Sequence, residues 1–224
     1  MEPRGLLLDL DDTLYGYVPV ERHARAAVLS EISRDLCVEL AEAGALYDAA
    51  RQRVKKRLGK TGAAHSRLLY LLDLASSARA PLSLPRKWER TFWGEYLRVM
   101  EPHPGVRELL AGWRALGNRT AIVTDLVVDI QLQKLEKFSL LELIDAIVVS
   151  EEVPLDKPAP EIFELACARL GVPRERCVMV GDNDAKDGAG ARALGIPFLQ
   201  VRGTEPDANG LTLQEVAREL GVPL

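Results

Sequence analysis

The stretch Leu6-Leu7-Leu8-Asp9-Leu10-Asp11-Asp12-Thr13 joins a short apolar run to three carboxylates and a hydroxyl. A strand buried on both faces of a parallel sheet is typically a continuous apolar run, so we expect a strand here that ends in acid. Carboxylates crowded at one strand end repel one another unless a cation or a proton intervenes. Proteins keep such crowding mostly where chemistry or a metal requires it, so this stretch predicts a functional site.

The second half of the chain repeats the same pattern of an apolar run followed by polar residues. The run Val178-Met179-Val180 is followed by Gly181-Asp182, with Asp187 five residues further on. Strands that alternate with helices of ordinary length predict a parallel sheet covered on both faces. The fold class that we predict is therefore α/β, with a doubly wound, Rossmann-like parallel sheet. The further strands are expected at 120–123, 146–149, 177–180 and 196–201, and the helices at 106–116, 128–138, 160–170 and 185–194.

Residues from about 18 to 100 show helical periodicity alone. Apolar residues recur at four-residue spacing from Val28 to Leu40, and an aromatic set between Trp88 and Tyr96 is expected to pack between helices. We predict an all-helical cap domain at 16–101, inserted after the first strand, and a core domain made of 1–15 and 102–224. The basic run 51–57 is interpreted as a solvated helix face, with attraction of an anionic substrate as the alternative.

Composition narrows the classes of function. The net charge of −4 does not provide the excess of basic residues that is typical of nucleic-acid-binding proteins. No apolar stretch approaches the length of about 20 residues that spans a membrane. The three cysteines are widely spaced without a CxxC pair, which argues against a disulfide framework or a zinc site. We therefore expect a cytoplasmic protein without nucleic-acid or membrane partners, and the sequence does not indicate an oligomeric state.

Ligands bind beyond the carboxyl ends of the strands in a doubly wound sheet. Carboxylate oxygens at these ends suit Mg²⁺, which takes one or two carboxylates together with phosphate oxygens of a substrate. A hydroxyl and an ammonium can hold the remaining phosphate oxygens, and a carboxylate can attack phosphorus to form an aspartyl phosphate. The residues that carry these groups are Asp9, Asp11, Thr124, Lys157, Asp182 and Asp187.

Four motifs in this order resemble the haloacid dehalogenase superfamily, in the branch with a helical cap after the first strand. They are the DxDxT motif 9–13, the strand end 122–124, the Lys157 of Asp156-Lys157-Pro158, and the GDxxxxD motif 181–187. The resemblance covers nearly the whole chain, and all four motifs together are far more specific than any one of them.

The resemblance implies a Mg²⁺-dependent phosphatase that acts on a small phosphorylated metabolite. Asp9 would be the nucleophile, and Asp11 would be the general acid for the leaving alcohol and then the base for water, a role that requires a raised pKa. Thr124 and Lys157 would bind the phosphate. The metal would be held by Asp9, the backbone carbonyl of Asp11, and Asp182, with Asp187 in support.

The sequence indicates the roles of a few other residues less directly. Asp125 follows Thr124 where many relatives carry Asn, and we expect it to cap the following helix. We interpret Asp12 as a turn residue. In the cap, His65 and Arg67 lie at a predicted helix start, a place where an anion can bind, and are candidate substrate contacts.

Alternative functions stay open at this point. A sugar phosphomutase uses the same core, and sequence alone does not identify the cap residues that would distinguish it. A 2-haloacid dehalogenase is disfavoured, because halide needs no proton and relatives with that activity generally lack an acid at the position of Asp11. A response-regulator receiver does not match the motif order, and nothing favours a silent binding protein, because each chemical position is filled.

Overall fold

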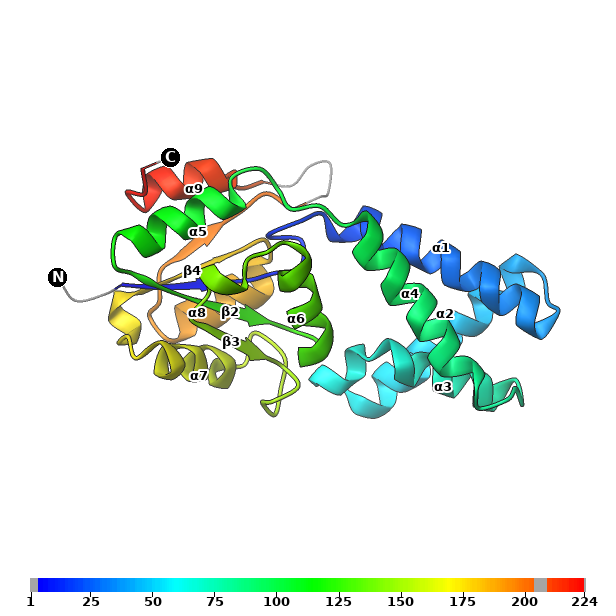
Figure 1. Cartoon of the computed structure of the whole chain (residues 1–224). Coiled ribbons are helices and arrows are strands. Elements are labelled where there is room, and N and C mark those ends of the chain that lie inside the picture. Colours follow the sequence, from blue (N-terminus) through cyan, green and yellow to red (C-terminus); the bar gives the residue numbers. More distant parts are fainter. Residues whose placement is uncertain (1–3, 204–208, 224) are drawn as a thin grey trace. The chain divides into compact units, whose positions relative to one another are not determined.

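The computed structural model describes residues 4–203 and 209–223. The chain divides into two compact units, of which one comprises Met1–Tyr17 with Glu101–Leu224 and the other comprises Val18–Met100 (Figure 1). We call the first the core unit and the second the helical unit, and we describe each by itself.

The core unit contains a five-stranded parallel sheet in the order β3-β2-β1-β4-β5. Strand β1 (Gly5–Leu8) lies at its centre between β2 (Arg119–Thr124) and β4 (Cys177–Gly181). Strand β3 (Ala146–Val149) pairs with β2, and β5 (Phe198–Gln200) pairs with β4. All four residues of β1 are buried, as the uninterrupted apolar run predicted, and the α/β fold class is confirmed.

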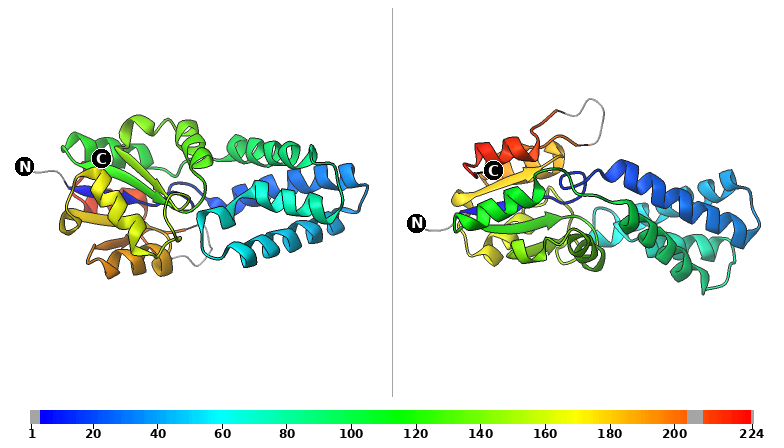
Figure 2. Two further views of the ribbon diagram at one scale, coloured as in Figure 1. Left: turned by 90° about the horizontal axis from the view of Figure 1, so that it is seen from below. Right: turned by 45° about the horizontal axis from the view of Figure 1, so that its top comes forward.

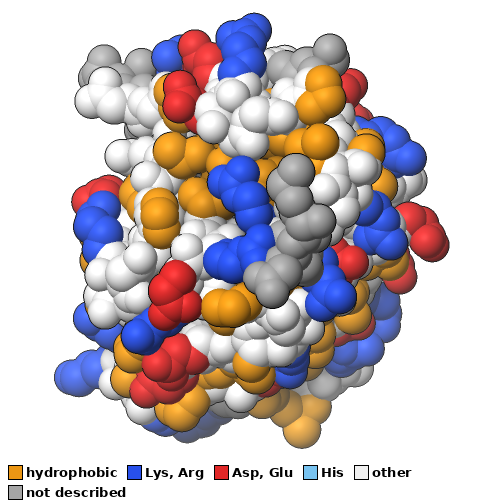
Figure 3. All heavy atoms as spheres, turned by 90° about the vertical axis from the view of Figure 1, so that its left-hand side faces the viewer, with side chains coloured by type: hydrophobic (Ala, Val, Ile, Leu, Met, Phe, Trp, Pro, Cys, Tyr) orange, Lys and Arg blue, Asp and Glu red, His pale blue; other side chains and the backbone are white. Residues whose placement is uncertain are grey.

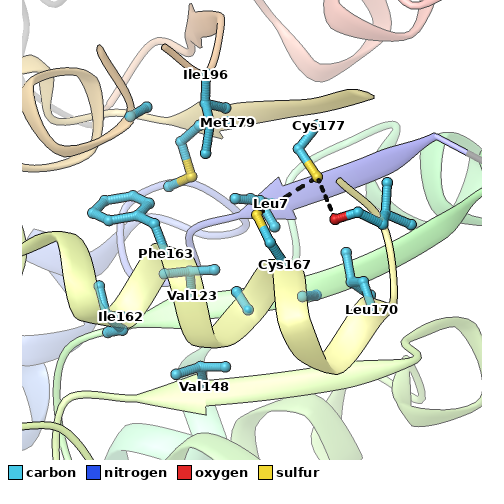
Figure 4. Close-up of a cluster of buried hydrophobic side chains, with 14 residues drawn as sticks. Leu7, Val123, Val148, Ile162, Phe163, Cys167, Leu170, Cys177, Met179 and Ile196 are labelled. Carbon is cyan, nitrogen blue, oxygen red and sulfur yellow. Dashed lines mark hydrogen bonds between the residues drawn. The ribbon is translucent and has the colours of Figure 1, made fainter. Parts of the chain in front are cut away.

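Helices cover both faces of this sheet (Figures 1 and 2). Helix α5 (Val106–Ala115) and α9 (Leu213–Glu219) lie on one face, and α7 (Pro160–Leu170) packs on β1, β2 and β3 from the other. Helix α6 (Val128–Lys137) follows β2, and α8 (Ala189–Ala193) contacts α7. A hydrophobic core cluster lies beneath α7, where Phe163, Leu7, Val123 and Met179 are completely buried (Figure 4).

Two details of the core unit differ from the sequence prediction. The helix expected at 185–194 begins with a π-helical turn (η4, Asp184–Gly188), and regular helix starts only at Ala189. The side chain of Asn183 caps that turn by accepting a hydrogen bond from the backbone N–H of Lys186 at 3.1 Å. The strand expected at 196–201 is confined to Phe198–Gln200. Short 3-10 turns (η2, Leu141–Leu143, and η3, Arg174–Arg176) precede β3 and β4.

The helical unit consists of α1 (Tyr17–Leu36), α2 (Leu40–Leu58), a 3-10 turn (η1, Gly62–His65), α3 (Arg67–Ser77) and α4 (Leu84–Val99). The periodicity from Val28 to Leu40 led us to expect one helix there, but Leu40 begins the next one and is 54% exposed. Cys37 separates them with a positive φ of 53°, a conformation that an α-helix cannot continue through. Trp88, Phe92 and Tyr96 are fully buried, so the aromatic set packs inside this unit as predicted.

One face of the molecule shows a mixture of side-chain types. On the face drawn in Figure 3, Lys and Arg side chains lie among acidic and hydrophobic ones. Arg53 and Arg57 of the basic run both pair with Asp73 on α3, at 2.7 and 3.3 Å. Within the described residues, none of the helices combines the length and apolarity needed to cross a bilayer.

Candidate active site

The strand β1 delivers Asp9 into the interior of the core unit. The backbone N–H of Asp9 donates to the carbonyl of Val180 at 2.9 Å, which extends the β1–β4 ladder by one residue. One carboxylate oxygen of Asp9 accepts from Lys157 Nζ at 2.5 Å, and the other accepts from Thr13 Oγ1 at 2.8 Å. Asp9 is 4% exposed and Lys157 is 5% exposed, so this ion pair lies almost wholly out of water.

Lys157 is held from three sides. Besides Asp9, its ammonium donates to Asp187 Oδ1 at 2.7 Å and to the carbonyl of Val123 at 3.0 Å. Burial opposes the charge of Lys157, but Asp187, Asp9 and Asp125 together raise its pKa well above the ordinary value. The lysine therefore stays charged, and it joins the end of β1 to the acidic cluster after β4.

Asp9, Asp182 and Asp187 form a compact carboxylate cluster. Each offers an oxygen, and these oxygens all lie within 4.8 Å of one another. Burial, together with Asp187 and Asp182, raises the pKa of Asp9 well above its ordinary range, although Lys157 opposes the shift. Burial and the neighbouring acids Asp187 and Asp12 raise the pKa of Asp182 to about 6. Three carboxylates around one ammonium carry excess negative charge, and hard oxygen donors in this number fit a divalent cation such as Mg²⁺.

Local packing explains how the acidic residues after β4, Asp182 and Asp187, are brought together. A Cβ atom at Gly181 would collide with the carboxylate of Asp187, so the end of β4 needs glycine for Asp187 to approach. Asp187 Oδ2 accepts from the backbone N–H of Asn183 at 3.2 Å. Thr13 links the two acidic strand ends, because its hydroxyl contacts Asp9 at 2.8 Å and Asp182 at 3.3 Å. The sequence motif included Thr13, but we had not predicted this bridging contact.

Asp11 lies in a different environment from Asp9. Its Oδ1 accepts from Lys134 Nζ at 2.5 Å and from the hydroxyl of Tyr15, and its Oδ2 accepts from Gln131 Nε2 at 3.1 Å. Burial raises the pKa of Asp11, but Lys134, Tyr15 and Gln131 outweigh it, and the net shift is downward. The expectation that Asp11 has a raised pKa is therefore wrong for this arrangement, because three donors stabilise its charged form.

The end of β2 is connected to Asp11 through Gln131. The amide nitrogen of Gln131 lies 2.6 Å from Thr124 Oγ1 and 2.9 Å from the carbonyl of Asp125. Lys134 and Gln131 are three residues apart on α6, so both project from one face of that helix. We did not predict either residue, although polar side chains at i and i+3 beside buried Ile130 and Leu135 were a signal in the sequence.

Asp125 does not cap the following helix, contrary to our expectation. Helix α6 begins at Val128, whose backbone N–H donates to Glu151 Oε2 at 2.8 Å and not to Asp125. Asp125 instead accepts from the backbone N–H of Lys157 at 3.0 Å and from Lys186 Nζ at 2.6 Å. These contacts link Asp125 to the backbone at Lys157 and to the side chain of Lys186. Asp12 is the turn residue that we expected, with a φ of 69° and a hydrogen bond from the backbone N–H of Tyr17.

The two candidate residues of the helical unit adjoin the start of α3. Ser66 caps α3 by accepting from the backbone N–H of Leu69 at 3.3 Å. Arg67 is buried, donates to the carbonyl of His65 at 2.9 Å, and places its guanidinium 5.4 Å from the ring of Phe92. His65 ends the preceding 3-10 turn. These contacts show that the Arg67 side chain packs in the interior of the helical unit.

Comparison with known proteins decides the family. The family model of haloacid dehalogenase-like hydrolases matches residues 3–195. The chain belongs to the haloacid dehalogenase-like hydrolases. Within this family, it is 37% identical over 199 residues to the ribulose-1,5-bisphosphate 5-phosphatase of Halopiger xanaduensis, covering 86% of this chain and 82% of that one. It is 30% identical over 200 residues to the glyceraldehyde 3-phosphate phosphatase of Methanopyrus kandleri, covering 89% and 84%.

The haloacid dehalogenase-like fold is also found in enzymes with a different reaction. The crystal structure of 2-haloacid dehalogenase from Pseudomonas syringae superposes with a TM-score of 0.74 at 22% identity, covering 98% of this chain and 99% of that one. At this identity, the likeness establishes the fold alone. The reaction must therefore be argued from the residues of the site.

Proposed function

We propose that this haloacid dehalogenase-like hydrolase is a magnesium-dependent phosphatase that hydrolyses a small phosphorylated metabolite through a phosphoaspartate on Asp9. The observation that carries the proposal is the buried Asp9–Lys157 pair beside Asp182 and Asp187. A carboxylate nucleophile in a water-poor site, with an ammonium and further acids around it, suits attack on a phosphate ester. The sequence relatives, which are named as phosphatases, point the same way.

The proposed roles follow the contacts of each residue. Asp9 attacks phosphorus, and the bond from phosphorus to the leaving oxygen breaks. Asp11 gives a proton to that oxygen and later takes one from the water that hydrolyses the phosphoaspartate. Lys157 and Thr124 hold phosphate oxygens. Since Lys157 also contacts Asp9, it aligns the nucleophile with the phosphate.

We place Mg²⁺ at Asp9 and Asp182, with the backbone carbonyl of Asp11 as a further ligand and Asp187 in support through Lys157. When bound, the ion would offset the charge that phosphate and Asp9 bring together. The side chain of Asp11 is not part of the carboxylate cluster, because Lys134, Tyr15 and Gln131 engage it.

We also propose that residues 16–101 are the cap domain that selects the substrate, with the core domain formed by 1–15 and 102–224. His65 is the better candidate for a substrate contact, since Arg67 is occupied inside the helical unit. Given the names of the two relatives, we place the substrate among small phosphorylated sugars and related metabolites. We further propose that the reaction takes place in the cytoplasm.

The test is Asp9→Asn, assayed with Mg²⁺ on phosphate esters, with Asp129→Asn as the control because Asp129 is exposed on α6. We expect the Asp9 variant to lose at least about 10³-fold in kcat while the control keeps it. Rapid acid quench of the native enzyme should capture one phosphoryl group per chain, and Asp9→Asn should capture none. Phosphoryl capture that survives Asp9→Asn contradicts the nucleophile. Conversion of a sugar phosphate to its isomer without phosphate release would favour the mutase alternative.

A further inference from the structure

Two cysteines meet at the end of the core unit where the strands begin. Cys167 lies on α7 and Cys177 is the first residue of β4, and their Sγ atoms are 3.7 Å apart (Figure 4). Both are buried, with 8% and 3% of their surface exposed. Asp182 follows the opposite end of β4, so neither thiol belongs to the candidate active site.

The local fold brings these thiols together. Helix α7 ends at Leu170, and Gly171 turns the chain with a φ of 61°, after which the N–H of Val172 donates to the carbonyl of Cys167 at 3.2 Å. Gly5 is the partner of Cys177 across the β1–β4 ladder. A Cβ atom at Gly5 would lie only 2.6 Å from Cys177 Sγ, so the missing side chain leaves the space that the thiol occupies.

The two thiols differ in access. Cys167 lines a surface groove of about 420 Å³, with Ala168, Val172 and Leu194 as apolar walls and Arg174 also lining it. Cys177 is not among the residues that line this groove, and its thiol donates weakly to the carbonyls of Val172 and Pro173, at 3.8 and 3.5 Å. The neighbouring Cys177 thiol lowers the pKa of Cys167, whereas the contact with Cys167 and burial raise the pKa of Cys177.

We propose that Cys167 and Cys177 form a redox-active thiol pair that is converted to a disulfide by a small-molecule disulfide entering the groove at Cys167. The Cys167 thiolate attacks one sulfur of that molecule, which breaks its S–S bond and releases one small thiolate. The Cys177 thiolate then attacks Cys167 Sγ, which breaks the mixed disulfide and releases the second small thiolate; the two released thiolates take up the two protons that the cysteines gave up. The protein loses two hydrogen atoms, and the small disulfide gains them.

The distance that must be closed is short. A disulfide bond is about 2.05 Å long, so the sulfurs need to approach by about 1.7 Å from their 3.7 Å separation. The closed ring would tie the last turn of α7 to the start of β4. Because the acids and Lys157 lie beyond the opposite ends of these elements, we expect phosphate-ester hydrolysis to be unchanged by oxidation, and the proposal does not depend on that activity.

Cys37 provides the control, because it is exposed and lies in the helical unit. Folded protein carrying Cys37→Ser is incubated with oxidised glutathione, alkylated, cleaved with trypsin and analysed by mass spectrometry without reduction. Protein that retains Cys37 is treated in parallel, so that the modification of this exposed thiol reports the strength of the oxidising conditions. Cleavage after Arg169 and Arg176 places the two cysteines on separate peptides. We expect a linked pair of peptides and the loss of two titratable thiols, both reversed by dithiothreitol.

Single variants in the same background test the order of attack. Cys177→Ala should accumulate glutathione on Cys167, and Cys167→Ala should leave Cys177 almost unmodified while the protein stays folded by circular dichroism. The proposal is overturned if both thiols stay reduced under conditions that fully modify Cys37 in the protein that retains it. It is also overturned if glutathione remains on Cys167 without closing the disulfide, or if Cys177 reacts equally fast without Cys167.

Discussion

Lys157 is the residue whose removal tests the proposed electrostatics of the site most directly. Its ammonium lies 2.5 Å from Asp9 and 2.7 Å from Asp187, and all three side chains are at most 6% exposed. Lys157→Met keeps most of the apolar stem and removes the charge. Breaking a buried ion pair by deleting one partner costs about 3–5 kcal/mol, because the other charge stays buried without compensation. With two carboxylates left behind, we expect a loss in the free energy of unfolding of about 4–5 kcal/mol without Mg²⁺.

The measurement is urea unfolding at pH 8 in EDTA, with Lys134→Met as the matched control. Lys134 is equally buried, but the carboxylate with which it forms an ion pair, Asp11, is 24% exposed and keeps its hydrogen bonds from Tyr15 and Gln131. We expect the control to lose about 1–3 kcal/mol. Mg²⁺ should restore more stability to Lys157→Met than to the native protein, since the ion would compensate the same carboxylates.

The pH dependence of this variant has a defined sign. Carboxylates that lose their cation have a higher pKa in the folded than in the unfolded chain. The loss in the free energy of unfolding is therefore present above the pKa of these carboxylates in the folded chain, and it is relieved as the pH falls through that pKa. Lys157→Met should accordingly be closer to native stability at pH 5 than at pH 8. A loss below about 1 kcal/mol at pH 8, or one equal to that of Lys134→Met, would refute the reasoning.

Three further predictions follow from individual residues. Asp11→Asn should lower kcat on alkyl phosphates by about 10²–10⁴-fold. The loss should be smaller on 4-nitrophenyl phosphate, because its leaving group needs little protonation. Equal losses on both substrates in steady-state assays would show that Asp11 is not the general acid. His65→Ala should raise KM for the physiological substrate and leave that for a small generic ester unchanged, and parallel changes on both would speak against a substrate contact. Because the pKa of Asp182 is raised to about 6, the affinity for Mg²⁺ in calorimetry should weaken as the pH falls from 8 to 5, and constant affinity would contradict it.

Much of the fold could be predicted because burial shows directly in the sequence. Each strand of the parallel sheet is an apolar run that ends near a polar residue, and the first of them, Leu6–Leu8, is completely buried. The helical region was harder. Periodicity runs through Cys37 into Leu40, and only the backbone conformation at Cys37 separates α1 from α2. A left-handed residue that is not glycine leaves no reliable signal in one sequence.

The candidate site was predictable to the extent that its residues lie at strand ends. Spacing alone placed Asp9, Lys157 and Asp187 at one edge of the sheet, and they lie within hydrogen-bonding distance there. Gln131 and Lys134 were missed because their contacts depend on which face of α6 is turned toward Asp11. Sequence periodicity defines the apolar face of a helix, but it does not say that polar side chains on that face meet a carboxylate.

The acidic strand end contains two carboxylates whose pKa values are shifted in opposite directions, although they are only two residues apart. Burial, with Asp187 and Asp182, raises the pKa of Asp9 despite its contact with Lys157, whereas Lys134 and its neighbours outweigh burial at Asp11 and lower its pKa. The proposed roles need the reverse, an ionised nucleophile and a proton carrier. A divalent cation among the three acids would lower the pKa of Asp9, since a bound metal is the largest local charge in such a site. Metal removal should therefore leave Asp9 less ionised, in addition to removing the charge that stabilises the phosphate. Asp11 must in turn be protonated before the leaving group departs, although the Lys134 ammonium favours its ionised form.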